Sequence, residues 1–437
     1  MTDPSPAHAA PVGDDGASET VVHIAAEYWP YARTGGLAEA VQGIAKFQGQ
    51  RGRPVLVFMP LYRKVREAFP RIEPCGEPFP VEIGQHREMA RVWEDPVRAP
   101  RDPRVLFIEH DGHFGRPGIY GEGHDYPDNH LRFAFFSKAV LQWLPEVVEA
   151  PALIHPHDWH TAFAPVYLRT HFAGDPFYDA LGSVLTVHNG GYQGHYQRDV
   201  LAAVGLSDEL FRWDLMEWYD QVNILKGGLA FSDIVTTVSP THAHELRTPK
   251  GGFGLHDAFT SLQDRFVGIL NGIDHEAWSP DIDPSIRRRY DADSLPAKAV
   301  NKAWLQEDLG LTVDPDLPMF GMTARLAGQK GFDLILGSDM VSKPDAQWVF
   351  LGEGEARYEE ALGALAKAWP DRVSGIFHFT EQREHELLAA ADFLLMPSQY
   401  EPCGLTQMRA QRYGALPVAR RVGGLCDTIE DRETGFL

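Results

Sequence analysis

Short runs of apolar residues alternate along this chain with segments of helical periodicity. In the first half, the apolar runs are rich in Val and Ile and have the length of strands buried on both faces of a parallel sheet. These runs cover residues 21–27, 54–60, 105–110, 152–159, 183–189, 233–239 and 267–273. Between them lie helical segments such as LRFAFFSKAVLQWL (131–144). The first half is therefore predicted to be a doubly wound α/β array.

The same alternation starts again in the second half. Five further strands are expected, at residues 319–325, 347–353, 373–379, 392–398 and 416–422. Helical segments separate them, at 356–369 and 382–391. Two such arrays in series predict two Rossmann-like domains, which bind ligands at the carboxyl ends of their strands. We expect a deep cleft between the domains, formed by loops from both.

Domain boundaries follow from this pattern. Residues 1–20 are polar and lack the basic start and apolar middle of a signal peptide, so they are predicted to be a disordered tail. The first domain is expected over 21–275 and the second over 319–437. Between them, 276–318 contains the Pro- and Asp-rich turn SPDIDPS and then a basic helix, and it is predicted to be the hinge.

Composition narrows the class of function. The formal net charge of −21 disfavours a nucleic-acid surface, which needs a basic face, but it is compatible with a neutral polysaccharide. An anionic substrate would need its own local group of Arg and Lys residues. No apolar run has the length of a membrane span, and three scattered cysteines are too few for a disulfide framework. A cytoplasmic protein is therefore expected.

Glycine-rich loops follow several of the predicted strands. EYWPYARTGGLAEA places Gly35 and Gly36 just before a helix, where bare backbone can approach a bound group and free N–H groups can bind an anion. GILNGID repeats the design with Asn271, and HNGGYQG supplies the side chains of His188, Asn189, Tyr192 and Gln193. Each loop alone fits an ordinary capped turn, but three at strand ends favour a binding cleft.

The segment HPHDWH, residues 155–160, invites a metal interpretation because His-x-His is a common ligand spacing. It does not fit the His-x-His-x-Asp-His pattern of metallohydrolases, since its aspartate comes one place too early. The alternative is a set of histidines and a tryptophan that line a cleft. We therefore predict a site without a metal or any other cofactor.

The second half supplies candidate phosphate ligands. Arg325 ends a predicted strand and Lys330 follows five residues later, and a guanidinium with an ammonium suits two linked phosphates. A surface ion pair is the alternative. In QYEPCGLTQ, Glu401 is placed to hold sugar hydroxyls, although a glutamate there can also simply compensate a helix dipole. The N–H groups expected to face a phosphate are those of Gly404, Leu405 and Thr406.

Together these motifs resemble those of the bacterial glycogen synthase and plant starch synthase family. The resemblance runs in family order over about residues 21–437, through RTGGLAE, DYPDNHLRF, HDWHT, HNGGYQG, LKGGLAFSDIVTTVSPTHAHE, GILNGID, RLAGQKG and PSQYEPCGLTQMRAQRYGALPVARRVGGLCDT. It implies the GT-B fold, in which two Rossmann-like domains close over the donor. It also implies transfer of glucose, with retention of configuration and without a metal, from a nucleotide-glucose to an α-1,4-glucan. ADP-glucose is the donor expected of a bacterial member.

The resemblance also implies residue roles on the sugar side of the site. His160 corresponds to a histidine near the transferred glucose, Asn271 to a residue that contacts it, and Asp128 to an acid close to the sugar. The RTGGL segment corresponds to a loop whose bare backbone lets the diphosphate and the glucose approach.

On the phosphate side, Arg325 and Lys330 correspond to the pair that binds the diphosphate and stabilises its charge as it leaves. Glu401, beside Cys403, corresponds to a carboxylate on the glucose hydroxyls. In this family the leaving phosphate is usually proposed to take the proton of the acceptor, so no side chain need be a strong base.

Several positions depart from the family pattern. Arg33, in the donor-binding loop, stands where the family has Lys, and Glu39 where it usually has Asp. Phe379 aligns with a tyrosine that stacks on the donor base, and it keeps the ring without the hydroxyl. The chain ends at ETGFL, so the second domain is expected to be incomplete relative to the family. These departures leave two alternatives open: a related enzyme with an altered donor or acceptor, and a catalytically weak glucan-binding protein.

Overall fold

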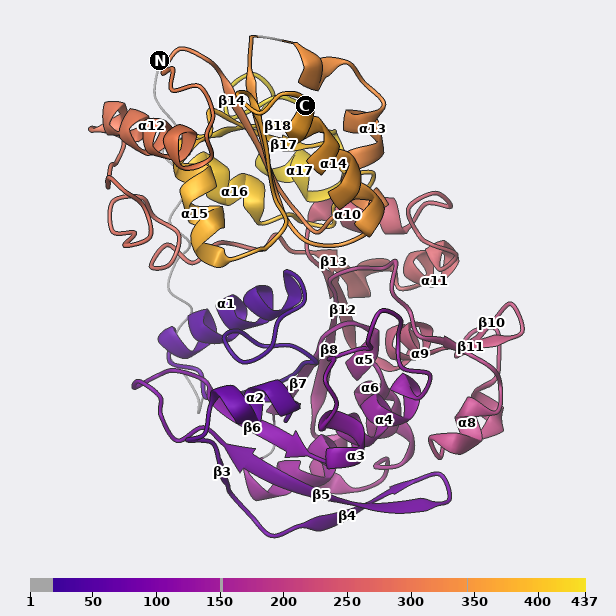
Figure 1. The fold of residues 1–437 in the computed structure, drawn as a ribbon. Helices are drawn as coiled ribbons and strands as arrows, with labels where there is room; N and C mark the ends of the chain where they lie inside the picture. The colour runs from indigo at the N-terminus through magenta and orange to yellow at the C-terminus, as the bar shows by residue number, and fades with distance from the viewer. Residues whose placement is uncertain (1–18, 150–151, 344) are drawn as a thin grey trace, which may run out of the picture.

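The computed structural model describes residues 19–149, 152–343 and 345–437. The predicted disordered tail lies outside the described residues except for its last two positions. Two sheets, each flanked by helices, form two lobes that meet through loops (Figure 1). None of the helices in these described ranges is both long and apolar enough to cross a membrane.

The first lobe is built on seven parallel strands in the order β13-β12-β8-β7-β1-β2-β6. They are β1 (Thr20–Ile24), β2 (Val55–Pro60), β6 (Arg104–Glu109), β7 (Ala152–Pro156), β8 (Gly182–Val187), β12 (Ile234–Thr237) and β13 (Phe266–Gly268). All residues of β2 are buried, as its unbroken apolar run predicts. All seven predicted strands are confirmed, but the run 267–273 is strand only to Gly268. Because β13 is an edge strand paired on one side, its backbone leaves the sheet there.

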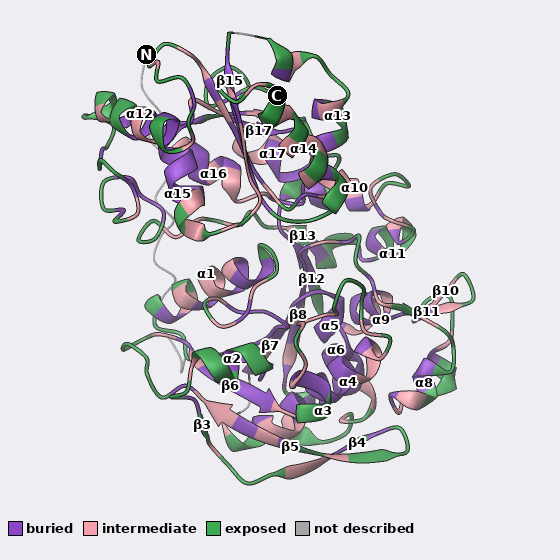
Figure 2. Ribbon diagram, in the orientation of Figure 1, coloured by how far each residue is buried: buried purple, intermediate pink, exposed green. Residues whose placement is uncertain are grey.

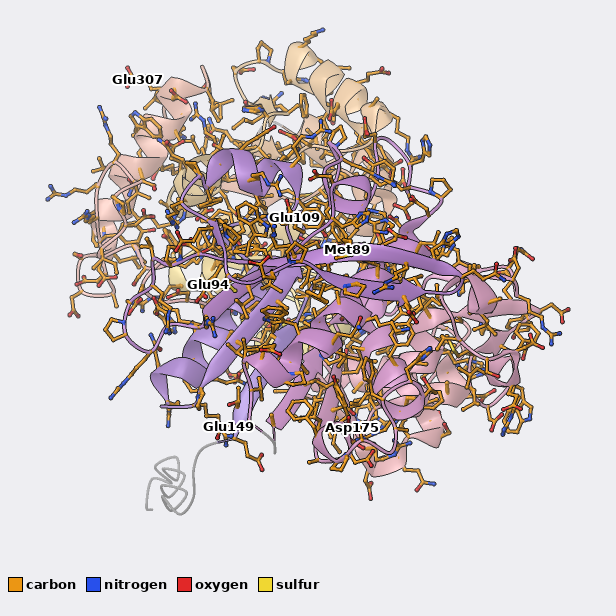
Figure 3. The ribbon with its side chains drawn as sticks, turned by 90° about the horizontal axis from the view of Figure 1, so that it is seen from below. Met89, Glu94, Glu109, Glu149, Asp175 and Glu307 are labelled. Carbon is orange, nitrogen blue, oxygen red and sulfur yellow. The ribbon has the colours of Figure 1, made fainter. Side chains whose placement is uncertain are left out.

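An antiparallel extension of this sheet was not predicted. It consists of β3 (Glu73–Pro74), β4 (Phe79–Ile83) and β5 (His86–Glu94), and β5 pairs with β6. Figure 3, viewed from below, shows this part of the sheet, with Met89 and Glu94 on β5. The two-residue connection between β4 and β5 contains Gly84 with φ of 57°, and a glycine between two alternating runs is a hairpin signal.

A second, small sheet was also missed. Its strands are β9 (His195–Tyr196), β10 (Glu217–Trp218) and β11 (Gln221–Asn223), in the order β10-β11-β9. Strands of two or three residues give too little alternation to be recognised in a sequence. Figure 1 shows the β10–β11 hairpin at the outer edge of the first lobe.

Helices cover both faces of the first sheet. They are α1 (Leu37–Gln50), α2 (Arg63–Ala68), α3 (Asp111–Phe114), α4 (Asn129–Trp143), α5 (Asp158–Thr161), α6 (Phe163–Thr170), α7 (Pro176–Asp179), α8 (Val200–Ala203), α9 (Ile224–Phe231), α10 (Pro240–Leu246) and α11 (His256–Ser261). The predicted helix 131–144 corresponds to α4, whose middle is buried throughout (Figure 2). Other elements surround the middle of this helix, and its buried residues include the charged Arg132 and Lys138 as well as apolar ones.

The second lobe has five parallel strands in the order β16-β15-β14-β17-β18, a doubly wound arrangement. The strands are β14 (Met319–Thr323), β15 (Gln347–Leu351), β16 (Val373–Ile376), β17 (Phe393–Met396) and β18 (Leu416–Ala419). Its helices are α12 (Lys298–Asp308), α13 (Phe332–Leu336), α14 (Ala356–Ala368), α15 (Glu381–Ala390), α16 (Thr406–Arg412) and α17 (Gly423–Thr428). The prediction of two Rossmann-like domains is confirmed.

The segment predicted to be the hinge, 276–318, packs along the second lobe. Trp278 and Tyr290 share a buried cluster with Leu388 and Tyr413. The Tyr290 hydroxyl also donates to the carbonyl oxygen of Tyr413 at 2.7 Å. The connection is therefore a packed layer and not a free linker.

Candidate active site

Loops from the two lobes meet where the sequence motifs predict a cleft. The Nη2 atom of Arg325, which follows β14, lies 3.0 Å from the hydroxyl of Tyr192 in the first lobe. The rings of Phe253 and Tyr400 lie 5.0 Å apart across the same interface. A β-carbon at Gly36 would lie 3.8 Å from Leu405 of the second lobe. Four of the predicted segments, RTGGL, HNGGYQG, RLAGQKG and QYEPCGL, thus contribute to the contact between the lobes.

The glycine loop of the first lobe is held in place by Glu27, which sequence analysis did not single out. The Glu27 carboxylate accepts hydrogen bonds from the hydroxyl of Thr34 at 2.7 Å and from the hydroxyl of Tyr120 at 2.6 Å. Burial raises the pKa of Glu27, and these hydrogen bonds oppose the rise. A β-carbon at Gly35 would meet no atom within 4 Å, so the loop backbone faces open space. The protein's own packing does not require glycine there, whereas close approach of a bound group would.

His160, on α5, lies in an aromatic pocket next to this loop. Its ring stacks on Tyr120 at 4.5 Å between centroids and meets Phe133 edge-on at 4.8 Å. Burial, reinforced by the charge of Arg132, lowers the pKa of His160 to about 3. Its Nδ1 atom is buried and has no hydrogen-bond partner among the residues that the structure describes. His160 is therefore a neutral hydrogen-bonding group and not an acid near neutral pH.

Asp158, two residues earlier, connects two of the predicted loops. It has a left-handed backbone, with φ of 58°, and its Oδ1 atom accepts the backbone N–H groups of His188 at 2.7 Å and Asn189 at 3.2 Å. Burial raises the pKa of Asp158 to about 7 despite these bonds. A non-glycine residue in this conformation marks a position that the surrounding structure over-determines. Asp158 thus fixes the end of β8 relative to α5.

The other two histidines of HPHDWH point away from His160. His155 and His157 lie with His23 in a buried cluster whose ring nitrogens are within 4.8 Å of one another. His157 Nε2 is 2.9 Å from His23 Nδ1, and His157 Nδ1 is 2.9 Å from His188 Nε2. His23 Nε2 is 2.8 Å from the side-chain oxygen of Gln48, which can only accept. The Gln48 oxygen therefore orients the hydrogen bonds that link His23, His157 and His188. Burial lowers the pKa of these three histidines and of His155, which keeps the imidazoles neutral.

On the second lobe, Lys330 and Glu401 form a pair. Lys330 Nζ lies 2.7 Å from Glu401 Oε2, which also accepts from the Ser398 hydroxyl at 2.9 Å. Gly331 follows with φ of 83°, and a β-carbon there would lie 2.2 Å from the carbonyl oxygen of Pro397. Glycine at this position lets the Lys330 loop pack against the end of β17.

The EPCGL segment places the remaining phosphate-side candidates. Cys403 is 4% exposed, and burial raises the pKa of its thiol to about 12, while a hydrogen bond from the backbone of Asn271 opposes the rise. Asn271 is thereby brought to this segment from the first lobe. Gly404, Leu405 and Thr406 precede the first intrahelical hydrogen bonds of α16, so their N–H groups point out of the helix end.

Arg33 lies between the lobes. Its Nη1 atom is 2.6 Å from Glu39 Oε1, and its guanidinium lies 5.4 Å from the ring centre of Phe379. The other oxygen of Glu39 accepts from Arg409 of α16 at 2.7 Å. Arg409 was not predicted, because no local pattern marks a contact between residues that are 370 positions apart.

Two predicted residues are engaged elsewhere. Asp128 forms a two-pronged ion pair with Arg116, at 2.7 and 2.6 Å, and these hydrogen bonds lower the pKa of Asp128. Gln193 is 3% exposed, and its amide donates to the carbonyl oxygens of Gly190 and Phe253. In this structure both side chains support loops of the cleft.

A cavity of about 560 Å³ opens beside the glycine loop. Its walls include Thr34, Tyr62, Lys64, Tyr120 and Asp125. The volume is within the range of small-molecule sites. Tyr120, in the wall of the cavity, also stacks on His160, so it lies between the cavity and that histidine.

Comparison with known proteins agrees with this geometry. A family model described as the starch synthase catalytic domain matches residues 20–261, and one described as glycosyl transferases group 1 matches residues 310–437. The chain is 39% identical to the glycogen synthase of Syntrophotalea carbinolica over 413 residues, which cover 94% of this chain and 85% of the relative. It is 41% identical to the glycogen synthase of Anaeromyxobacter sp. strain Fw109-5 over 424 residues, 95% of this chain and 87% of the relative.

Solved structures give the same result. The catalytic domain of starch synthase IV from Arabidopsis thaliana, bound to ADP and acarbose, matches with a TM-score of 0.86 and 34% identity, over 95% of this chain and 85% of that one. Sucrose-phosphate synthase from Thermosynechococcus elongatus matches with a TM-score of 0.58 and 19% identity, a likeness of fold alone.

Proposed function

The chain belongs to the glycogen synthase and starch synthase family, a family of retaining glycosyltransferases with the GT-B fold, and on that premise we propose that it transfers glucose from ADP-glucose to the non-reducing end of an α-1,4-glucan. The observation that carries the proposal is that the two lobes meet at these motifs: Arg325 contacts Tyr192 of the HNGGYQG loop, and Gly36 of the glycine loop lies against Leu405 of the EPCGL segment. We infer that the reaction takes place in the cytoplasm.

Arg325 and Lys330 bind the diphosphate of the donor in this proposal. Two cations aimed at oxygens that gain charge as the bond breaks lower the barrier more than they tighten ground-state binding. Lys330 is held by Glu401 at 2.7 Å, so the carboxylate orients the ammonium while its other oxygen is available to a sugar hydroxyl. The N–H groups of Gly404 to Thr406 add donors to the phosphates.

The glucose then lies between Glu401 and the pocket of His160. A neutral His160, with its pKa near 3, serves as a hydrogen-bond partner of the sugar and not as a proton donor. Asn271 contacts the same glucose in this proposal, whereas Asp128, paired with Arg116, supports a flanking loop. The cavity beside Thr34 and Tyr120 accommodates the acceptor end of the glucan.

The proposed step needs no protein base. The acceptor hydroxyl attacks the anomeric carbon on the face from which the diphosphate leaves, one C–O bond forms as the other breaks, and a phosphate oxygen takes the hydroxyl proton. Support comes from the buried carboxylates nearby. Glu27 accepts hydrogen bonds from Thr34 and Tyr120, and Asp158 is bound to two N–H groups, so both are already engaged.

A second candidate is transfer from a nucleotide-glucose with a different base. The observation that favours it is the position of Arg33, which covers the ring of Phe379 where the family has a lysine and a tyrosine. The planar guanidinium offers base edges a fork of donors that an ammonium cannot supply.

The test is a transfer assay with radiolabelled ADP-glucose and UDP-glucose on glycogen. We expect label from ADP-glucose to appear in the polymer. An exo-acting β-amylase should release this label as maltose, because the enzyme cleaves only α-1,4 linkages. Preference for UDP-glucose would support the second candidate. Absence of transfer from both donors would contradict both candidates and favour the alternative of a catalytically weak glucan-binding protein. Lys343→Ala, at an exposed lysine of the same lobe, is the matched control for Lys330→Ala.

A further inference from the structure

Two large aromatic residues at the edge of the first lobe are largely exposed to solvent. Trp213 is 80% exposed and Tyr219 is 76% exposed. Trp218 lies between them in sequence, and its ring meets that of Tyr219 at 4.8 Å and 90°. We call Trp213, Trp218 and Tyr219 the hairpin platform. Single exposed hydrophobic side chains are common on protein surfaces, but several large aromatic residues gathered at one edge are typical of an interaction site.

The platform is held rigidly. Trp218 pairs with Gln221 across a two-residue turn whose residues, Tyr219 and Asp220, both have left-handed backbones, with φ of 48° and 61°. Such turns ordinarily use Asn and Gly, so a tyrosine at the tip is kept at a conformational cost. Packing within the protein does not offset this cost, because most of the surface of Tyr219 is exposed to solvent.

Further contacts join the platform to the loops of the cleft. The Trp218 ring stacks on His195 at 4.3 Å with an interplanar angle of 9°, and its indole N–H donates to the carbonyl oxygen of Gly254 at 3.0 Å. His195 follows the HNGGYQG loop, and Gly254 follows Phe253, which contacts Tyr400 beside Glu401. Lys226 donates to the carbonyl oxygens of both Trp213 and Glu217, which ties the Trp213 loop to β10.

The surroundings of the platform favour a neutral ligand with many hydroxyl groups. Arg212 and Asp214 form an exposed ion pair next to Trp213, and Glu217 and Asp220 flank the turn. Three of these four side chains are acidic, and the whole chain carries a net charge of −21, so an anionic polymer is repelled. Carboxylates and guanidinium groups are good partners of sugar hydroxyls, and the apolar face of a glucose ring suits a flat aromatic surface.

We propose that the hairpin platform is a second α-glucan site, outside the catalytic cleft, that holds a chain of the polymeric acceptor. The proposal rests on the proposed function for its ligand class. A polymer bound there raises the local concentration of its neighbouring chain ends at the cleft, without any new contact at the reacting atoms.

The direct test is native gel electrophoresis in the presence of glycogen, with dextran as the control polymer. We expect glycogen to retard the protein, and Trp213→Ala and Tyr219→Ala each to weaken binding by about three- to tenfold, the range of one lost aromatic contact. Trp213→Phe should restore most of the retardation. Phe47→Ala, at a 56% exposed aromatic residue on α1, is the matched control and should bind as the parent does.

Kinetics separates this site from the cleft. With glycogen as acceptor the platform variants should show a higher KM, whereas kcat/KM on maltotetraose, too short to span both sites, should be unchanged. Unchanged retardation, or an equal loss on the short acceptor, would overturn the proposal. So would a sedimentation change from dimer to monomer in Trp213→Ala, which would make the platform a contact between two copies. Retardation by glycogen without any glucosyl transfer would refute the proposed function and leave the platform site standing.

Discussion

Lys330 is bound to Glu401 in the structure and faces the leaving diphosphate in the proposed reaction. We predict that Lys330→Ala and Arg325→Ala each lower kcat by on the order of a hundredfold or more, because both cations stabilise charge that develops only as the bond breaks. The KM for the donor should rise much less than kcat falls. Initial rates over a range of donor concentrations separate the two, and near-normal turnover in either variant would refute the assignment.

In the proposed function the Phe379 ring stacks on the donor base; in the structure the Arg33 guanidinium lies 5.4 Å from the centre of that ring. We predict that Phe379→Ala mainly raises the apparent constant for the donor, by about three- to tenfold, because one stacking contact is lost. Phe379→Tyr should retain donor affinity since it keeps the ring. Isothermal titration with ADP measures this directly, and an unchanged affinity in Phe379→Ala would show that the base binds elsewhere.

His155 and His157 lie in the buried histidine cluster, whose closely spaced ring nitrogens could bind a metal ion. The prediction of a metal-independent reaction can therefore be tested directly. We predict full activity after exhaustive dialysis against a strong chelator, since the phosphate-side cations are side chains and the proposed step needs no bound metal. Metal analysis of the purified protein runs beside the assay. Stoichiometric zinc that depends on His155 and whose removal abolishes transfer would contradict the prediction.

At the scale of elements, α15 is attached to the segment before α12 by a buried charge pair. His385 Nδ1 lies 2.8 Å from Asp283 Oδ2, and the His385 ring stacks on Trp278 at 3.9 Å. Burial alone would lower the pKa of His385, but its bonds to Asp283 and Glu381 outweigh burial and raise the pKa from 6.5 to about 9. A raised pKa means that the pair stabilises the fold fully below pH 6.5 and loses this contribution as the pH rises through 9.

We therefore predict that the free energy of unfolding of the parent protein decreases between pH 6 and pH 10. This decrease should exceed the decrease in His385→Gln by up to about 3 kcal/mol. Denaturant unfolding at the two pH values measures the difference. His378→Gln, at a histidine of the same lobe whose side chain is 88% exposed, is the control and should follow the parent. A parallel pH dependence of parent and His385→Gln would show that the pair carries no such charge.

At the scale of the whole molecule, Glu39 joins the two lobes. One carboxylate oxygen binds Arg33 of its own lobe and the other binds Arg409 of α16, whose guanidinium also lies 3.9 Å from the ring centre of Trp278. Glu384, 4% exposed, lies 3.7 Å from Arg409, and burial raises its pKa. Arg409 thus offsets two carboxylates, the buried Glu384 of its own lobe and the partly exposed Glu39 of the other.

We predict that Arg409→Met opens the cleft and lowers kcat/KM by about tenfold or more, because it removes the ion pair that joins the lobes and leaves the buried Glu384 without its cation, at a cost of about 3–5 kcal/mol. Small-angle scattering should show a larger radius of gyration. The Glu39→Gln variant and the double variant complete a cycle, and a coupling below about 0.5 kcal/mol would mean that the pair does not hold the lobes together.

The local pattern of the sequence determined the two α/β arrays, their twelve central strands and the motif loops at the strand ends. Buried parallel strands appear in the sequence as unbroken apolar runs, and glycines before helices mark places where the backbone must stay bare. Both features can therefore be recognised from the sequence alone. The family resemblance, carried by the same motifs, is confirmed by the comparisons.

Only the tertiary structure decided which of these side chains meet. Glu27 against Tyr120, His23 against His157, and Glu39 against Arg409 join positions that are far apart in sequence and have no local signature. The same holds for the separation of His160 from His155 and His157, because a strand and the helix after it direct side chains to different sides. Periodicity reports which face of an element is buried. It does not report which element covers that face, and the contacts between elements therefore had to come from the folded chain.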